Sequence, residues 1–263
     1  MERTPLTLAP EKLVGELSAL LGNSAPGSAV MAFDGDGTLW SGDVGEDLFH
    51  CATREGFLLP DAAPPLRAEA DRYGVVLGGE GEANGIARRL MAAYQAGQYP
   101  ERETCAMMAW CFAGRPLSEV EALARRVLVE SDVSGRLVRE LTSVLSWARE
   151  AKVRCVLISA SPRAIVEPAG KLWGFAPSEI AAATPRVEAG VIAAELVGSV
   201  PYAEAKLTAG KALFGSARWL ATFGDNVFDI EMLKAAEVGV AVRPKPKLQT
   251  ELATLGLRLL APG

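Results

Sequence analysis

The chain has 263 residues, of which 49% are hydrophobic, so it can bury a sizeable core and is not expected to be disordered. Its 27 basic and 32 acidic residues give a formal charge of -5, which offers no cationic surface for a nucleic-acid backbone. Polar residues throughout segment 1–22 exclude a secretory signal or membrane span there, so we expect a cytoplasmic protein without a membrane partner.

Short apolar runs alternate with helical patterns along the chain. Residues 10–22 have apolar residues at helical spacing between a proline and a glycine, which predicts a helix. The run 29–33 is continuously apolar and stops at Asp34, as expected for a buried strand that leads into a loop. The later segments predict helices at 136–151, 162–174 and 228–237, strands at 153–158, 218–223 and 238–242, and a hairpin within 180–196.

The segment between the first two predicted strands is far longer than a crossover needs. Residues 43–134 have a helical rhythm interrupted by scattered glycines and prolines. We therefore predict an inserted helical cap domain at 43–134, with residues 1–42 and 135–263 forming the core domain. The chain has a single histidine, His50. We expect His50 and the aromatic residues of the insert to have a structural role in this cap rather than to contact substrate.

Alternating strands and helices predict an α/β fold, a doubly wound and mostly parallel sheet with helices on both faces. Such sheets bind ligands beyond the carboxyl ends of their strands. Polar residues follow each of the main predicted strands, at Asp34, at Ser159 and at Asp225. We expect these side chains to meet at one edge of the sheet.

The pair Asp34 and Asp36 is the first chemical signal. Residues two apart on an extended backbone project to the same side. Two carboxylates about 4 Å apart repel by roughly 4 kcal/mol at an effective dielectric constant of about 20, so one must be protonated or a cation must neutralise them. With Asp225 and Asp229 from another strand end, a cation is the better answer, and oxygen ligands of this kind suit Mg²⁺.

Motifs in a fixed order resemble those of the haloacid dehalogenase superfamily. An apolar strand leads into Asp34-Gly35-Asp36-Gly37-Thr38, the strand Leu157-Ile158 ends at Ser159, Lys206 lies at the start of a helix, and Gly224-Asp225-Asn226-Val227-Phe228-Asp229 follows the next strand. The position of the insert matches the C1 cap of that superfamily. The nearest branch is that of the phosphoserine phosphatases and related small-molecule phosphatases.

This resemblance implies a role for each matching residue. Asp34 would be the nucleophile that forms an aspartyl phosphate, and Asp36 would be the general acid and base. Ser159 and Lys206 would hold the phosphoryl oxygens, with Thr38 beside them and Asp229 orienting its neighbours. The side chains of Asp34 and Asp225 and the backbone carbonyl of Asp36 would bind Mg²⁺.

Two choices remain open at this stage. Lys211 lies on the same predicted helix as Lys206, but the segment opens at Pro201-Tyr202, so a lysine in its first turn reaches the strand ends more easily. The cap glutamate of phosphoserine phosphatases has no single counterpart, because Asp43, Glu46 and Asp47 all lie near its place. Acidic residues there, Asp43 and Glu46 above all, would suit a phosphorylated metabolite with an ammonium group, such as phosphoserine or phosphocholine.

Alternative interpretations exist for each motif alone. Asp-Gly-Asp-Gly also occurs in turns and calcium loops, and a serine before Pro162 also caps helices. The order of the motifs on successive strand ends favours the catalytic interpretation. The function predicted is therefore Mg²⁺-dependent hydrolysis of a small phosphate monoester, with phosphotransfer to another acceptor or a receiver-type signalling domain as alternatives; the oligomeric state is not predicted.

Overall fold

A parallel sheet forms the centre of the protein, for which a computed structural model describes residues 5–262. The sheet has 7 strands in the order β1-β9-β8-β7-β2-β3-β4, and each neighbouring pair runs parallel. Their bounds are β1 Leu6–Leu8, β2 Ala29–Phe33, β3 Arg154–Pro162, β4 Ile180–Ala183, β7 Arg218–Gly224, β8 Val238–Ala241 and β9 Arg258–Leu260. The α/β fold with a parallel sheet is thus confirmed.

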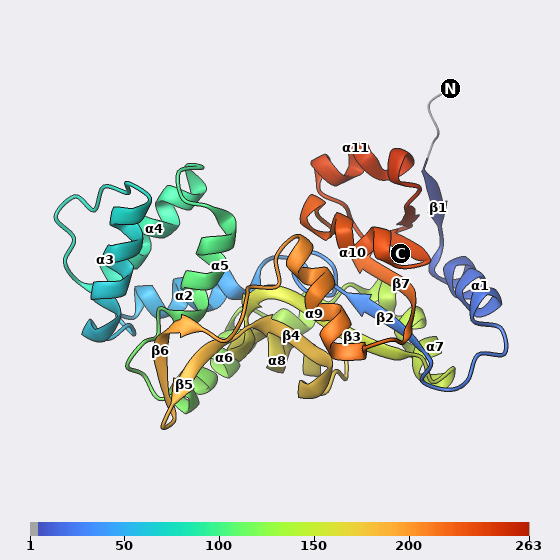
Figure 1. Ribbon diagram of the computed structural model, residues 1–263, viewed down its shortest axis with the longest axis horizontal. Coiled ribbons are helices and arrows are strands. Elements are labelled where there is room, and N and C mark those ends of the chain that lie inside the picture. Colours follow the sequence, from blue (N-terminus) through green and yellow to red (C-terminus); the bar gives the residue numbers. More distant parts are fainter. Residues whose placement is uncertain (1–4, 263) are drawn as a thin grey trace.

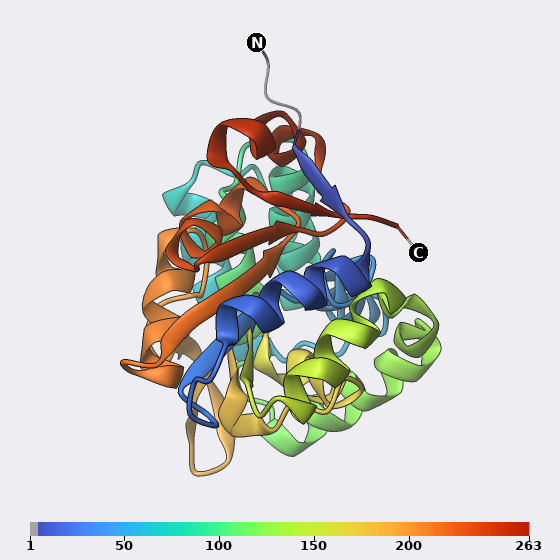
Figure 2. The ribbon, with the colours of Figure 1, turned by 90° about the vertical axis from the view of Figure 1, so that its right-hand side faces the viewer.

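Helices cover both faces of this sheet. Their bounds are α1 Pro10–Leu21, α7 Thr142–Glu150, α8 Arg163–Lys171, α9 Glu204–Phe214, α10 Ile230–Ala235 and α11 Pro246–Leu255. On β2, Met31 and Phe33 pack in the cluster that holds α1 and α7, whereas Val30 and Ala32 pack with side chains of α9 and α10. Figure 2 shows α1 lying beside α7 over one face. A strand with every residue buried requires this double cover.

The interval 43–134 is helical. It contains α2 Val44–Arg54, α3 Ala63–Arg72, α4 Ala83–Gln95, α5 Glu101–Trp110 and α6 Leu117–Glu130. In Figure 1, α3 and α4 lie at one end of the molecule, away from the sheet, whereas α5 contacts β3 and α6 runs along α8. The hydrophobic cluster under α1 and α7 continues without a break into these helices. The division into a cap at 43–134 and a core stays a prediction.

Several boundaries differ from the sequence-based expectation. The predicted helix 136–151 begins only at Thr142, because Ser41 N donates to Arg136 O and Val138 N donates to Leu39 O, which holds this stretch against the loop after β2. The strand predicted at 153–158 continues to Pro162, so Ser159 lies within it. The helices predicted at 162–174 and 228–237 are shorter, at 163–171 and, after a 3-10 turn at 227–229, at 230–235.

The predicted hairpin at 180–196 is divided in the structure. Its first residues form β4 of the main sheet, and only β5 Pro185–Glu188 and β6 Val191–Leu196 form the antiparallel pair. The sheet also extends beyond β8 to β9 and β1, and helix α11 connects β8 to β9; the sequence pattern did not indicate these three elements. Within residues 5–262, no helix combines the length and the apolar character needed to cross a lipid bilayer.

Candidate active site

The loop after β2 carries the first two aspartates. β2 lies between β3 and β7, so the carboxyl ends of these strands are adjacent. Asp34 continues the sheet by donating its backbone N–H to Phe223 O at 2.9 Å, and the chain then turns tightly, with Leu39 N bonded to Gly35 O at 2.8 Å. This turn leaves Asp34 5% exposed at the end of the sheet.

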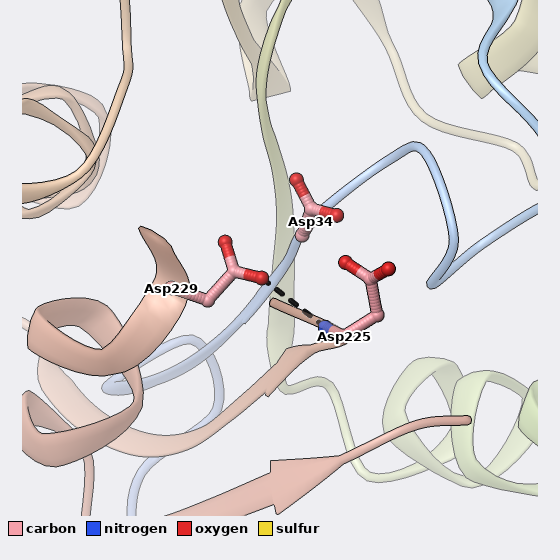
Figure 3. A group of neighbouring side chains, drawn as sticks. All are labelled: Asp34, Asp225 and Asp229. Carbon is pink, nitrogen blue, oxygen red and sulfur yellow. Dashed lines mark hydrogen bonds between the residues drawn. The ribbon is translucent and has the colours of Figure 1, made fainter. Parts of the chain in front are cut away.

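Carboxylates from two strand ends converge there. One oxygen each of Asp34, Asp225 and Asp229 lies within 4.8 Å of the others, and all three residues are buried. Figure 3 shows the three carboxyl groups around one space, Asp34 from the loop after β2 and the other two from the segment after β7. The close grouping of residues so distant in sequence concentrates negative charge in a buried site.

Lys206 lies against this cluster. Its ammonium group is 2.5 Å from Oδ1 of Asp34 and 2.5 Å from Oδ1 of Asp229, and the lysine is 5% exposed. Burial alone would lower the pKa of Lys206, but the charges of Asp229 and Asp34 outweigh it and raise the pKa above its ordinary value. Lys206 is therefore a fixed cation beside the candidate nucleophile.

Asp229 is fully occupied by protein donors. Its Oδ1 accepts from Lys206, and its Oδ2 accepts from the backbone N–H groups of Asp225 and Asn226 at 3.1 and 3.0 Å. These bonds fix the turn that carries Asp225. Asp229 thus orients its neighbours, and its oxygens have little capacity left for another ligand.

A glycine makes the approach of Asp225 possible. Gly37 has a φ of +83°, and a Cβ at this position would lie 2.1 Å from Oδ2 of Asp225. Only glycine combines this left-handed backbone with so close a neighbour. Gly37 therefore permits the end of β7 to lie against the loop after β2.

The charges within the cluster are incompletely balanced. Burial raises the pKa of Asp34 to about 7, against the opposing effect of Lys206, and burial together with the charge of Asp34 raises the pKa of Asp225 to about 7. Asp225 has a single ion-pair partner among the described residues, the exposed Lys245 at 3.4 Å. Oxygen donors with excess negative charge fit a divalent cation such as Mg²⁺.

Asp36 faces a different set of neighbours. Its Oδ1 accepts from Trp40 Nε1 at 2.7 Å and from Val44 N at 2.8 Å, and its Oδ2 accepts from Ser161 Oγ at 2.6 Å. Burial raises the pKa of Asp36 to about 7, as does the nearby Asp43, while these hydrogen bonds oppose the shift. A carboxyl with a pKa near neutrality can act as both acid and base.

The two predicted hydroxyl groups lie in or beside the loop after β2. Thr38 Oγ1 donates to Asp34 Oδ2 at 3.2 Å, so its hydroxyl holds the carboxylate. Ser159 is 1% exposed and its Oγ accepts from Ser161 N at 3.1 Å. The Ser159 hydroxyl proton is not committed by that bond and is available to an anion.

The acidic residues at the start of α2 differ in their surroundings. Asp43 caps the helix by accepting from Glu46 N at 2.8 Å, a structural task that the sequence interpretation did not assign to it. Asp47 pairs with Arg136. Glu46 is partly buried, and burial followed by the charge of Asp36 raises its pKa. Within residues 5–262, Glu46 is therefore the one of the three acidic residues that neither caps the helix nor forms an ion pair.

Several residues of the site were missed by sequence reasoning. Trp40 and Ser161 contact Asp36, and Lys245 contacts Asp225. Ser161 and Trp40 are close in sequence to recognised motifs, but Lys245 gave no signal of its own. Lys211, the alternative to Lys206, is exposed near the end of α9.

Comparison with known proteins gives a family and a set of similar folds. The family model for haloacid dehalogenase-like hydrolases matches residues 31–234. No curated protein matches the chain.

Three solved structures illustrate the fold similarity. A protein of unknown function from Bordetella pertussis Tohama I has a TM-score of 0.70 at 20% identity, covering 89% of this chain and 99% of that chain. A substrate-bound phosphoserine phosphatase has a TM-score of 0.53 at 15% identity, and the match covers 89% of this chain and 93% of that chain. A phospho-aspartyl intermediate analogue of phosphoserine phosphatase has a TM-score of 0.51 at 16% identity, and the match covers 88% of this chain and 92% of that chain.

Proposed function

Since the chain belongs to the haloacid dehalogenase-like hydrolases, we propose that it is a Mg²⁺-dependent phosphatase that hydrolyses a small phosphate monoester through an aspartyl phosphate on Asp34. The observation that carries this proposal is the convergence of Asp34, Lys206 and Asp225 at the adjoining ends of β2 and β7. Phosphoryl transfer through an aspartyl phosphate needs a buried carboxylate, a fixed cation beside it, and a cluster of carboxylates suited to a divalent cation.

The residues that would hold Mg²⁺ are Asp34 and Asp225 through their side chains and Asp36 through its backbone carbonyl. Their chemistry fits, because the pKa values of both side chains are raised by burial in a cluster of like charges. Bound there, the ion would neutralise charge on the phosphoryl oxygens. Asp229 would keep the turn of Asp225 in place.

In the first step, a carboxylate oxygen of Asp34 attacks phosphorus, and the bond between phosphorus and the ester oxygen breaks. The leaving oxygen takes its electron pair and the proton of Asp36. Lys206 and the hydroxyl of Ser159 offset the charge of the phosphoryl oxygens, and Thr38 holds the attacking carboxylate. The products of this step are the alcohol and the aspartyl phosphate.

In the second step, the roles of Asp36 reverse. Its carboxylate removes a proton from water, the water oxygen attacks phosphorus, and the bond from phosphorus to Asp34 breaks. Inorganic phosphate leaves, and both aspartates return to their initial states. Because the carboxyl of Asp36 serves both steps, its position controls the whole cycle.

The proposed substrate class is a phosphorylated metabolite with a cationic group. Two acidic residues of the helical interval interact electrostatically with charged groups of the site: Glu46 on α2 with Asp36, and Glu101 on α5 with Lys245 and Lys206. Burial raises the pKa of Glu101, and the charges of Lys245 and Lys206 counteract this, so Glu101 lies within the electrostatic reach of the site. Phosphoserine phosphatases among the similar structures support a substrate such as phosphoserine, and phosphocholine also joins a phosphate to a cationic group, although it has no carboxylate.

The proposal is tested by assaying the purified protein with p-nitrophenyl phosphate and a panel of phosphorylated metabolites, with MgCl₂ and with EDTA. We expect magnesium-dependent release of phosphate and a phosphate adduct on Asp34 in rapidly quenched samples. Absence of turnover on every ester would favour the receiver-type alternative. Predominant transfer to an added alcohol would instead show a phosphotransferase.

A further inference from the structure

The carboxylate of Asp36 is held by three hydrogen-bond donors from different parts of the chain. Trp40 belongs to the loop after β2, Val44 begins α2, and Ser161 lies near the end of β3. The distances are 2.7 and 2.8 Å to Oδ1 and 2.6 Å to Oδ2. A side chain bound at both oxygens has a fixed direction, so these donors decide where Asp36 points.

The donors at the two oxygens differ in kind. Oδ1 meets an indole N–H and a backbone N–H, which donate and cannot accept. Oδ2 accepts from the hydroxyl of Ser161, which leaves one of its lone pairs available, whereas the two donors engage both lone pairs of Oδ1. The protonated form of Asp36 therefore carries its proton on Oδ2.

The position of Ser161 is itself determined by the fold. Ser161 is 3% exposed, and its backbone N–H donates to Ser159 Oγ at 3.1 Å. On the other side it packs against α2, where a Cβ at Gly45 would lie 2.8 Å from Ser161 Oγ. The hydroxyl therefore has little freedom except rotation about its own bond.

We propose that Ser161 and Trp40 are positioning residues for Asp36, an inference that rests on the proposed function. Trp40, with Val44 N, keeps Oδ1 as a permanent acceptor, so that the proton transferred to the leaving oxygen always leaves from Oδ2. The Ser161 hydroxyl donates to one lone pair of Oδ2 throughout, and the other lone pair carries the proton that passes to the leaving oxygen and is regained when water is deprotonated. No proton is gained or lost by Ser161.

The test compares two esters of similar size, phenyl phosphate and p-nitrophenyl phosphate, in the presence of Mg²⁺. Phenolate is a poorer leaving group than p-nitrophenolate, so its departure depends more on protonation by Asp36. The value of kcat/KM reports the step in which the leaving group departs. We expect Ser161→Ala to lower kcat/KM for phenyl phosphate by about 10- to 100-fold and for p-nitrophenyl phosphate by less than about 3-fold. Trp40→Phe should shift the ratio in the same direction.

Ser131→Ala is the matched control. Ser131 Oγ also makes a 2.6 Å hydrogen bond, to Val127 O at the end of α6, and has no contact with Asp36. This variant should leave the ratio of the two kcat/KM values unchanged. The melting temperature of each variant shows whether a loss of activity comes from unfolding or from a displaced Asp36 carboxyl. If Ser161→Ala does not fold, the Trp40→Phe variant tests the positioning role instead.

Equal losses on both esters, or no loss on either, would overturn the positioning role while leaving the proposed function standing. A wild-type protein inactive on both esters would instead overturn the proposed function. These results are therefore distinguishable in one set of measurements.

Discussion

The ammonium group of Lys206 lies 2.5 Å from Oδ1 of Asp34, although the two residues are 172 positions apart in sequence. The contact joins the helix before β7 to the loop after β2. It places a permanent positive charge against the carboxylate that we propose as nucleophile, and the predictions below follow from this geometry and from the carboxylates around it.

Asp34→Asn should abolish turnover while the protein stays folded. The amide keeps the shape of the side chain but is a far weaker nucleophile, so we expect kcat to fall by at least about 10³-fold. Phosphate release and circular dichroism measure the two properties. Near-normal activity in the variant would refute the assignment of the nucleophile.

Lys206→Ala and Lys211→Ala should have very different effects. Lys206 is buried between two carboxylates, whereas Lys211 is exposed on the same helix. We expect kcat/KM to fall by about 10²- to 10³-fold for Lys206→Ala and to change little for Lys211→Ala. Steady-state kinetics on one ester decide between them, and the opposite ranking would show that Lys211 contacts the phosphate.

Magnesium should stabilise the protein more at high pH than at low pH. Burial raises the pKa of Asp34 and Asp225 from 3.8 to about 7, so the folded protein binds more protons than the unfolded chain between these values. Its stability therefore falls as pH rises through this window, as the two carboxylates ionise beside each other. Metal ions compete with protons for these oxygens and remove the repulsion.

Thermal melts with MgCl₂ and with EDTA measure this effect. The increase in melting temperature caused by Mg²⁺ should be larger at about pH 8 than at about pH 5. Asp225→Asn serves as the control and should reduce the difference. An equal increase at both pH values would show that the ion binds away from these carboxylates.

Gly37→Ala should damage the site more than Gly97→Ala. Both glycines have a left-handed backbone, with φ of +83° and +73°, so each alanine costs about 1–2 kcal/mol of strain. A Cβ at Gly37 would also lie 2.1 Å from Asp225 Oδ2, whereas nothing lies within 4 Å at Gly97. Activity measured alongside melting temperature separates the two contributions.

The expected result is a loss of activity and of Mg²⁺ response specific to Gly37→Ala, with a small decrease in melting temperature for Gly97→Ala and a larger one for Gly37→Ala, because its Cβ also meets Asp225. If the two variants lost activity equally, the close approach of Gly37 to Asp225 would have no part in the site.

The sequence alone determined the α/β architecture and the residues that meet at the site. Alternating apolar strands and amphipathic helices predict a parallel sheet, and a parallel sheet brings the carboxyl ends of its strands to one edge. Asp34, Ser159 and Asp225 each follow or end an apolar run, so their proximity was predictable without any knowledge of their contacts.

Only the tertiary structure decided which atoms face one another. The donors to Asp36, the choice of Lys206 over Lys211 beside Asp34, and the contact of Lys245 with Asp225 depend on how distant segments pack. The late start of α7 has the same origin, because residues 39–41 compete for its backbone groups. The local sequence pattern determines whether a segment forms a helix or a strand and which of its residues are buried. Hydrogen bonds between distant segments form only after the packing of the core has set the distances between those segments.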